Sequence, residues 1–124
     1  MSNKRTVVIG ASNNPERYAY KATLSLQAKG HEVFPVGIRN GQIATDRVIY
    51  DEIDTVTLYV GPQNQPDWYE YILELQPKRI IFNPGTESEE LVALAKSKNI
   101  ETVEACTLVM LSIGNYWNLV FYNF

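Results

Sequence analysis

The sequence predicts an α/β fold: a three-layer sandwich around a mainly parallel, five-stranded sheet. Short runs of β-branched residues recur along the chain, segments with helical spacing of apolar residues alternate with them, and turns rich in glycine, proline and asparagine separate the two kinds. This alternation favours right-handed crossovers, which leave helices on both faces of a parallel sheet. A length of 124 residues fits one compact domain, so we expect residues 1–124 to form a single domain.

The first predicted strand, residues 6–9, consists entirely of β-branched residues and is followed by Gly10. A run of this kind is typical of a strand that is buried on both faces. Further runs predict strands at residues 33–36, 56–60, 79–82 and 102–103. Between the second and third strands, Ile43 and residues 48–50 indicate a short hairpin or an irregular excursion.

Helices are predicted in the segments between and after these strands. The first has Ala19, Ala22 and Leu26 on one face and ends near Gly30. The faces expected to be buried in the next two helices are Trp68, Ile72 and Leu75, followed by Leu91, Leu94 and Ala95. A last apolar helix, residues 108–113, begins after the fifth strand.

Capping signals mark where two of these helices begin. Asp67 is the predicted N-cap of the helix after the third strand, and Thr86 and Glu89 have capping-box spacing before the next helix. Strands and helices in this order predict a Rossmann-like domain.

Composition and charge exclude several classes of function. The chain has 11 Lys and Arg against 14 Asp and Glu, a formal charge of -3, so its overall field repels a polyanion and no nucleic-acid partner is expected. One histidine and one cysteine cannot supply the usual soft metal ligands, and a lone cysteine makes no internal disulfide. No apolar segment reaches the length of a signal-peptide core or of a membrane span. We therefore expect a cytoplasmic protein with neither a metal nor a membrane partner.

The loops at the carboxyl ends of parallel strands meet along one edge of the sheet, where ligands bind. The first of these loops, residues 10–15, consists of small and polar residues before a helix. Free amides and the helix dipole at such a turn favour phosphate oxygens, which predicts a nucleotide-diphosphate site. Taken alone, Gly10 could mark only a tight turn and Ser12 only a helix cap.

A nicotinamide dinucleotide is the weaker prediction for this loop. Ser12 and Pro15 stand where the dinucleotide fingerprint has its second and third glycines. No acidic residue follows the second strand to hold ribose hydroxyls. Arg39 stands there instead, suited either to an additional phosphate or to solvent.

Neither His31 nor Cys106 is expected to be catalytic. His31 lies in a helix-to-strand turn, at the opposite edge of the sheet, and we expect it to be exposed. Cys106 follows the last strand without a histidine to act as its base, although a helix start could lower its pKa. We interpret it as a small buried thiol.

The segment of residues 116–122 is unusually aromatic. The plainer interpretation is an edge strand or a segment that packs over the core. The alternative is a subunit contact, which would make the protein a homodimer through this segment.

Three blocks of sequence together resemble the CoA-binding domain family, small stand-alone Rossmann-like proteins similar to the CoA-binding part of succinyl-CoA synthetase and acyl-CoA synthetases. The blocks are residues 8–12 with Pro15, residues 30–36 and residues 82–88, and Cys106 follows them. The resemblance covers nearly the whole chain. Two segments depart from it: residues 37–38 are Gly-Ile where the family typically has Asn-Pro, and residues 18–20 stand where a glycine is often found.

The resemblance implies that the first loop holds the CoA diphosphate, that the loop after the second strand lies near the adenosine, and that two later loops border the pantetheine. Together with the reasoning on the loops, this gives the expected ligand-binding residues, which around the first helix are Gly10, Ala11, Ser12, Asn13, Pro15, Tyr18 and Tyr20. Those in the later loops are Val36, Gly37, Arg39, Gly61, Pro62, Asn83, Pro84, Gly85 and Cys106. Tyr18 or Tyr20 would either stack on the ligand or partly fill the groove.

The leading hypothesis is non-catalytic binding of CoA or an acyl-CoA, because the sequence has no recognisable catalytic set. One alternative is a module of the NAD(P)-binding domain superfamily that senses NAD(P) or another nucleotide. A further alternative is an enzyme that uses Cys106 in thiol exchange or acyl transfer, which the position of Cys106 at the carboxyl edge would permit.

Overall fold

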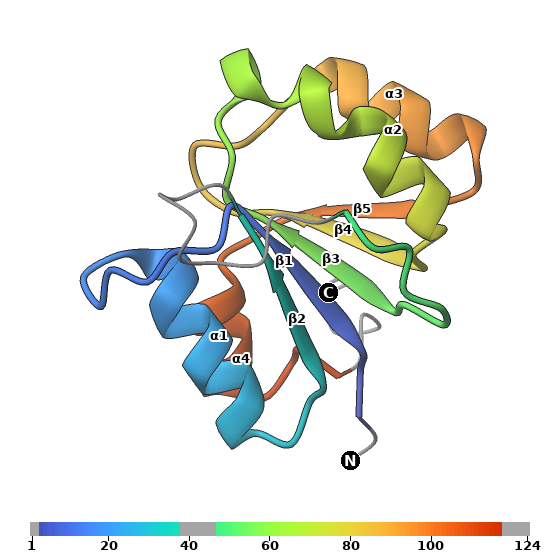
Figure 1. The fold of residues 1–124 in the computed structure, drawn as a ribbon. Helices are drawn as coiled ribbons and strands as arrows, with labels where there is room; N and C mark the ends of the chain where they lie inside the picture. The colour runs from blue at the N-terminus through green and yellow to red at the C-terminus, as the bar shows by residue number, and fades with distance from the viewer. Residues whose placement is uncertain (1–2, 38–46, 118–124) are drawn as a thin grey trace.

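The computed structural model describes residues 3–37 and 47–117. Its sheet has five strands in the order β2-β1-β3-β4-β5 (Figure 1), and every neighbouring pair is parallel. The strands are β1 (Thr6–Ile9), β2 (Val33–Val36), β3 (Thr55–Leu58), β4 (Arg79–Phe82) and β5 (Glu101–Glu104). The predicted five-stranded sheet is thus confirmed, and it is wholly rather than mainly parallel.

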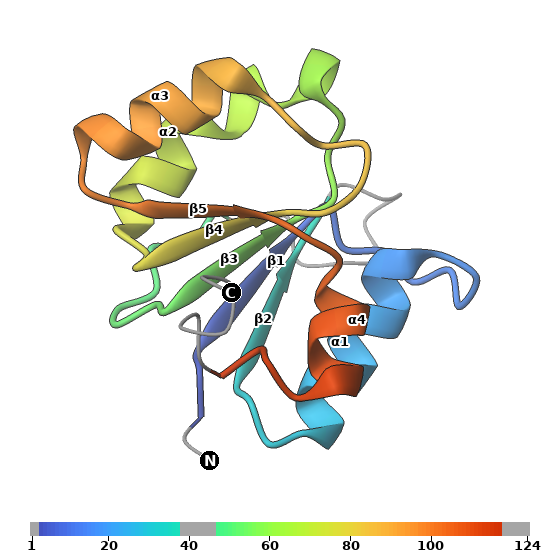
Figure 2. The ribbon, with the colours of Figure 1, turned by 180° about the vertical axis from the view of Figure 1, so that it is seen from behind.

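The helices form the outer two layers of the sandwich. They are α1 (Tyr18–Ala28), α2 (Pro66–Leu75), α3 (Glu89–Ser97) and α4 (Thr107–Ile113), with one 3₁₀ turn, η1 (Pro62–Asn64), before α2. Helices α1 and α4 cover one face of the sheet, and α2 and α3 cover the other (Figures 1 and 2). This arrangement confirms the predicted three-layer, Rossmann-like fold.

The three central strands are buried on both faces, as their β-branched and apolar sequences predict. All four residues of β1, β3 and β4 are buried, whereas the edge strand β5 has exposed ends. The strand register places Ile9 beside Leu58, and Leu58 beside Phe82. The carboxyl ends of these strands are therefore in register, and the loops that follow them begin side by side at the same edge of the sheet.

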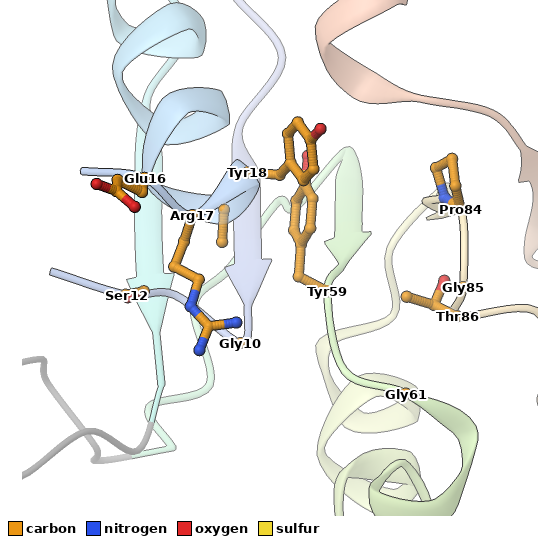
Figure 3. Close-up of a pocket in the computed structure, with 11 residues that line it drawn as sticks. Gly10, Ser12, Glu16, Arg17, Tyr18, Tyr59, Gly61, Pro84, Gly85 and Thr86 are labelled. Carbon is orange, nitrogen blue, oxygen red and sulfur yellow. The ribbon is translucent and has the colours of Figure 1, made fainter. Parts of the chain in front are cut away.

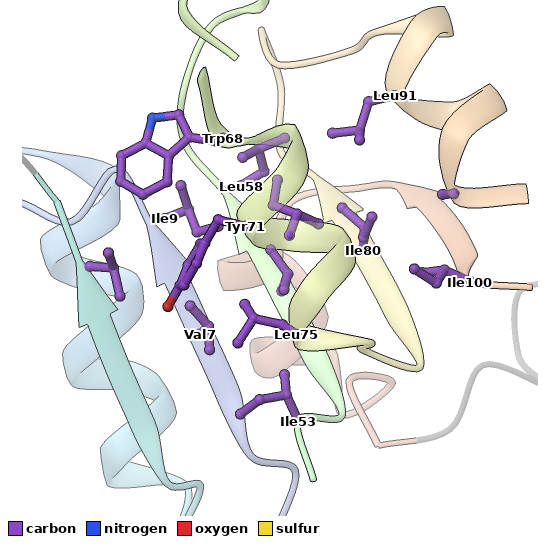
Figure 4. Close-up of a cluster of buried hydrophobic side chains, with 14 of the residues drawn as sticks. Val7, Ile9, Ile53, Leu58, Trp68, Tyr71, Leu75, Ile80, Leu91 and Ile100 are labelled. Carbon is purple, nitrogen blue, oxygen red and sulfur yellow. The ribbon is translucent and has the colours of Figure 1, made fainter. Parts of the chain in front are cut away.

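Two apolar clusters hold the layers together, one on each face. Alternating residues of β1 enter different clusters: Val7 and Ile9 pack under α2 and α3 (Figure 4), while Val8 packs with Leu26 of α1 and Met110 of α4. This alternation is the expected consequence of side chains pointing to opposite faces along a strand.

Several predicted element boundaries were wrong. Helix α2 begins at Pro66 with Gln65 as its N-cap rather than Asp67, because proline suits the first helical position. Helix α3 is capped by Ser88, whose hydroxyl accepts from the Leu91 amide. The Thr86 hydroxyl is engaged elsewhere, since it donates to the Asn83 carbonyl at 2.8 Å. Residues 48–50 form no strand, which agrees with the predicted irregular excursion rather than the hairpin, and Ile43 lies outside the described residues.

His31 is placed at the amino edge of the sheet as predicted, but the expectation that it is exposed was wrong. It is buried: its Nδ1 accepts from the Lys4 amide at 2.9 Å, and its ring lies 5.1 Å from that of Tyr116 and 5.2 Å from that of Trp117. Tyr116 itself is fully buried in the cluster under α1 and α4. Residues 118–122 of the predicted aromatic segment lie outside the described residues. No helix in the described parts of the chain is long and apolar enough to cross a membrane.

Candidate functional site

Strand order reverses at β1, which marks the carboxyl edge beside it as the expected ligand crevice. The chain passes from β1 to β2 on one side and then returns to β3 on the other. Two pockets open at this edge, and both are lined by Gly10, Tyr59 and Gly61. Because they share these residues, the two pockets adjoin at the ends of β1 and β3, and we refer to them together as the groove.

The first pocket has a volume of about 400 Å³ and lies between the start of α1 and the loops that follow β3 and β4 (Figure 3). Its lining residues are Gly10, Ser12, Glu16, Arg17, Tyr18, Ala19, Tyr59, Gly61, Pro84, Gly85 and Thr86. Figure 3 shows the Arg17 side chain extending into the pocket while the Glu16 carboxylate points away from it. The pocket thus combines a helix N-terminus with a cation.

The second pocket, about 420 Å³, lies on the α2 side of the groove and adds Ala11, Asn64, Asp67 and Trp68 to the lining. Arg47 forms part of its wall, with its guanidinium carbon 3.9 Å from the centre of the Trp68 ring. Each pocket falls in the lower part of the range of roughly 300–1,000 Å³ found for small-molecule sites. Arg47 was not predicted, because its place beside Trp68 depends on packing between segments that are distant in sequence.

The loop after β1 is fixed by backbone contacts that only glycine permits. Gly10 has a φ of +91°, and the amides of Gly10 and Ala11 both donate to the Val36 carbonyl, at 2.9 and 3.1 Å. A β-carbon on Gly37 would lie 2.4 Å from the Ala11 carbonyl oxygen. The glycine at position 37, one of the departures from the family pattern, therefore lets the end of β2 pack directly against this loop.

These bonds also decide which amides of the loop remain available to a ligand. The Asn14 amide donates to the Ser12 hydroxyl at 3.0 Å. Within the described chain, no acceptor is found for the amides of Ser12 and Asn13, or for those of Tyr18 and Ala19 at the start of α1. Helix α1 has no side-chain cap, and Tyr18 and Ala19 at its start line the first pocket, so these unbonded donors lie beside it.

Asn83 lines neither pocket, and its side chain instead makes hydrogen bonds to neighbouring elements of the protein. Its Nδ2 donates to the Thr57 hydroxyl at 2.7 Å and to the Leu58 carbonyl at 2.9 Å, and its Oδ1 accepts from the Thr107 amide at 2.9 Å. Both amide hydrogens are therefore used within the protein. Asn83 links β3, the end of β4 and the start of α4.

Tyr59 is a lining residue that the sequence reasoning missed. It is half-buried, and its hydroxyl has no hydrogen-bond partner among the described residues. Burial raises the pKa of this phenol, and the nearby Cys106 raises it further, so the buried hydroxyl remains protonated. Its position directly after β3, at the carboxyl edge, was the signal that could have identified it.

The structure brings part of the predicted set to the groove. The predicted residues that line it are Gly10, Ala11, Ser12, Tyr18, Gly61, Pro84 and Gly85. Those that line neither pocket are Asn13, Pro15, Tyr20, Val36, Gly37, Pro62, Asn83 and Cys106. Arg39 lies outside the described residues. Tyr18 is 68% exposed, so it stands at the rim of the first pocket and leaves it open.

Other reactive groups are few at this edge. Cys106 is a free, half-buried thiol at the N-cap of α4. Among the described residues there is no group of three or more His, Cys, Asp or Glu side chains that could hold a metal ion. His31 is at the opposite edge, where the groove does not reach.

Comparison with solved structures finds close matches to the fold. A crystal structure of an uncharacterized protein is 48% identical, with a TM-score of 0.90 over 94% of this chain and 100% of that one. A Thermus thermophilus protein, cell-free ID.343, matches at 22% identity and TM-score 0.79, over 92% of this chain and 91% of that one. A hypothetical protein from Pyrococcus horikoshii OT3 matches at 24% identity and TM-score 0.77, over 90% of this chain and 83% of that one.

Comparison of sequences identifies the family. Among the curated proteins, no match is found. Residues 4–112, which include every described strand and nearly all of the described helices, match the family described as CoA binding domain. The resemblance predicted from the sequence blocks is thereby confirmed, and the chain belongs to the CoA-binding domain family.

Proposed function

We propose that the protein binds CoA or an acyl-CoA in the carboxyl-edge groove without transforming it. The observation that carries the proposal is the first pocket. In a chain of the CoA-binding domain family, this pocket is open and is lined by the uncapped start of α1. A diphosphate suits these donors because it is anionic and presents several acceptors.

The two pockets suit the two ends of a long ligand. The diphosphate would lie against the amides of Ser12, Tyr18 and Ala19, near Arg17. The pantetheine arm would run through the first pocket between Tyr59 and the loops at Gly61 and Pro84–Thr86. The adenosine would occupy the second pocket, where Arg47, which lies over Trp68 and donates to the Asp67 carbonyl, would offer its remaining donors to the 3′-phosphate. Arg39, which the sequence resemblance assigned to this end, is a second candidate for that contact.

A binding role rather than a catalytic one is supported by the chemistry along the groove. Asn83 uses its amide group within the protein, and His31 is at the opposite edge. The alternative of thiol or acyl transfer would use Cys106, which lines neither pocket. If that alternative holds, Cys106→Ser abolishes turnover of acetyl-CoA while CoA affinity remains.

Calorimetric titration tests the proposal directly. We expect CoA to bind more tightly than ADP or NAD, and binding to weaken at high salt because phosphate contacts are screened. Weaker binding of dephospho-CoA than of CoA would indicate a cation at the 3′-phosphate, with Arg47→Ala and Arg39→Ala as the deciding variants. Tighter binding of NAD than of CoA would favour the nicotinamide alternative, and absence of binding by all four ligands contradicts the proposal.

Self-association through the aromatic carboxyl-terminal segment is a separate part of the proposal. Its described beginning, Tyr116, is buried within the protein's own core, so a contact would have to use residues beyond 117. Light scattering on the full chain and on a chain ending at Trp117 distinguishes a dimer through this segment from a monomer.

A further inference from the structure

One buried side chain, Gln65, joins the two loops that form a wall of the first pocket. Gln65 has no exposed surface. Its Nε2 donates to the carbonyl of Val60, two residues after β3, at 2.8 Å, and to the carbonyl of Thr86, in the loop after β4, at 2.5 Å. Both hydrogens of the amide nitrogen are used, so a single group links the loop after β3 to the loop after β4, where Thr86 lies 21 positions beyond Gln65 in sequence.

These loops supply the pocket wall that faces α1. Gly61 comes from the first loop, and Pro84, Gly85 and Thr86 come from the second (Figure 3). Since two of these residues are glycines, the backbone itself forms much of the surface, and its position determines how wide the pocket is. Gln65 lines neither pocket and acts on that width only through the carbonyls it holds.

The second loop is held on its other side by separate contacts. Thr86 returns to Asn83 through two bonds, from its amide at 3.0 Å and from its hydroxyl at 2.8 Å. Asn83 is fixed to β3 and α4. The last paired residues of β3 and β4 are Leu58 and Phe82. Beyond them, the Gln65 amide connects the loop after β3 to the loop after β4.

Of the two polar atoms in the Gln65 side chain, only the nitrogen makes hydrogen bonds within the described residues. Its Oε1 is buried and has no hydrogen-bond partner among the described residues. An unmet acceptor in the interior is unfavourable, and an apolar side chain of similar length would fill the same space without it. We therefore attribute the value of an amide at this position to the two hydrogen bonds that its nitrogen donates.

We propose that Gln65 is a positioning residue that holds the pocket for the pantetheine arm of CoA at its binding width by linking the loops at Val60 and Thr86. The inference rests on the proposed function. It differs from a general stabilising role because only the first pocket takes its wall from both of the loops that Gln65 joins, whereas the second pocket is lined by Val60 and Gly61 of the first loop and by no residue of the loop after β4.

The test compares two ligands on one variant. Gln65→Met keeps the length of the side chain and removes both donors, and the probes are CoA and its nucleotide part alone, adenosine 3′-phosphate 5′-diphosphate. We expect calorimetry to give about a tenfold loss of CoA affinity, because the wall is no longer preorganised, with the nucleotide affinity within about twofold of wild type. Gln63→Met, the same change at an exposed position of the same loop, should alter neither affinity.

Each outcome of the comparison decides something different. An equal loss for both ligands, or no loss for either, overturns the positioning role. If wild-type protein binds neither ligand, the proposed function fails before Gln65 is tested. If circular dichroism shows that Gln65→Met is unfolded, Gln65→Asn replaces it: its amide is one carbon shorter and reaches at most one of the two carbonyls, so the same selective loss of CoA affinity is expected.

Discussion

The two edges of the sheet are built from the same five strands but in opposite ways. At the carboxyl edge, glycines let the backbone turn closely, helix α1 begins without a side-chain cap, and a groove stays open. At the amino edge, large side chains close the space. His31, Arg79 and Tyr116 are all buried there and contact one another through their rings and the guanidinium.

The amino edge is a polar core. Arg79 donates to the Thr55 hydroxyl at 2.7 Å and to the Tyr116 carbonyl at 2.8 Å, and its guanidinium carbon lies 4.4 Å from the centre of the Tyr116 ring. The Tyr116 hydroxyl shares a hydrogen bond of 2.7 Å with Thr6. These contacts link β1, β3 and β4 to the segment after α4. The comparison indicates that this edge supplies stability, whereas the carboxyl edge leaves donors free for a ligand.

The largest effect is expected for Gly37→Ala, which changes the carboxyl edge where β2 packs on the first loop. The new β-carbon would meet the Ala11 backbone at 2.4 Å, so the loop must move. We expect a loss of about 3 kcal/mol in the free energy of unfolding, measured with urea, together with loss of CoA binding. Gly61→Ala is the matched control for stability, since its β-carbon would meet only the flexible Gln63 side chain. Wild-type stability in Gly37→Ala would contradict the close packing.

The second largest effect is expected for a substitution at the amino edge, which should change stability but not ligand binding. Arg79→Met removes buried, charged hydrogen bonds from the amino edge and leaves the groove untouched. We expect the free energy of unfolding to fall by about 2 kcal/mol while the Kd for CoA, measured at a temperature where the variant is folded, stays unchanged. A large change in Kd with little change in stability would reverse the assignment of the edges.

A smaller effect is expected for Arg17→Ala, which removes an exposed cation from the first pocket. The Kd for CoA should rise about fivefold, roughly 1 kcal/mol, and the difference should shrink in 1 M salt. The free energy of unfolding should not change. Lys29→Ala, just beyond the other end of α1, serves as the control and should leave the Kd as it is. Equal effects of the two substitutions would mean that only net charge matters.

The smallest effect concerns the protonation of His31. Burial, and secondarily Lys4 and Arg79, lower the pKa of His31 below its ordinary 6.5, while Asp54 acts in the opposite direction. Below pH 6.5 the unfolded chain therefore binds a proton that the native state does not, so stability is fully present above pH 6.5 and is lost as pH falls towards the native pKa. Urea unfolding at pH 7.5 and 5.5 should show a smaller loss for His31→Gln than for wild type. Equal losses of unfolding free energy in the two proteins would mean that His31 does not cause the pH dependence.

The fold was predictable because its signals are local. β-branched runs, helical spacing and glycine or proline turns identify the five strands and four helices within a few residues. The errors occur where two side chains could cap the same helix. Thr86 has the right spacing to cap α3, but its hydroxyl donates to the Asn83 carbonyl, and Ser88 caps the helix instead.

The site was predictable only in outline. Sequence identifies the loops that reach the carboxyl edge, and of the residues predicted there Gly10, Gly61 and Gly85 line the first pocket. It does not show which side chains those loops bury against one another. Gln65 and Arg47 were therefore missed, and Asn83, expected at the ligand, is engaged within the protein. The burial of His31 likewise depends on Tyr116, which is distant in sequence.

The central claim is that the free amides at the start of α1 receive the CoA diphosphate. Titration of ¹⁵N-labelled protein with CoA, followed by amide chemical shifts, tests it most directly. We predict that the largest shifts occur at Ser12, Asn13, Tyr18 and Ala19, with little change at His31 and Tyr116. Saturable binding with shifts confined to the amino edge, or no shift at the start of α1, would contradict the account.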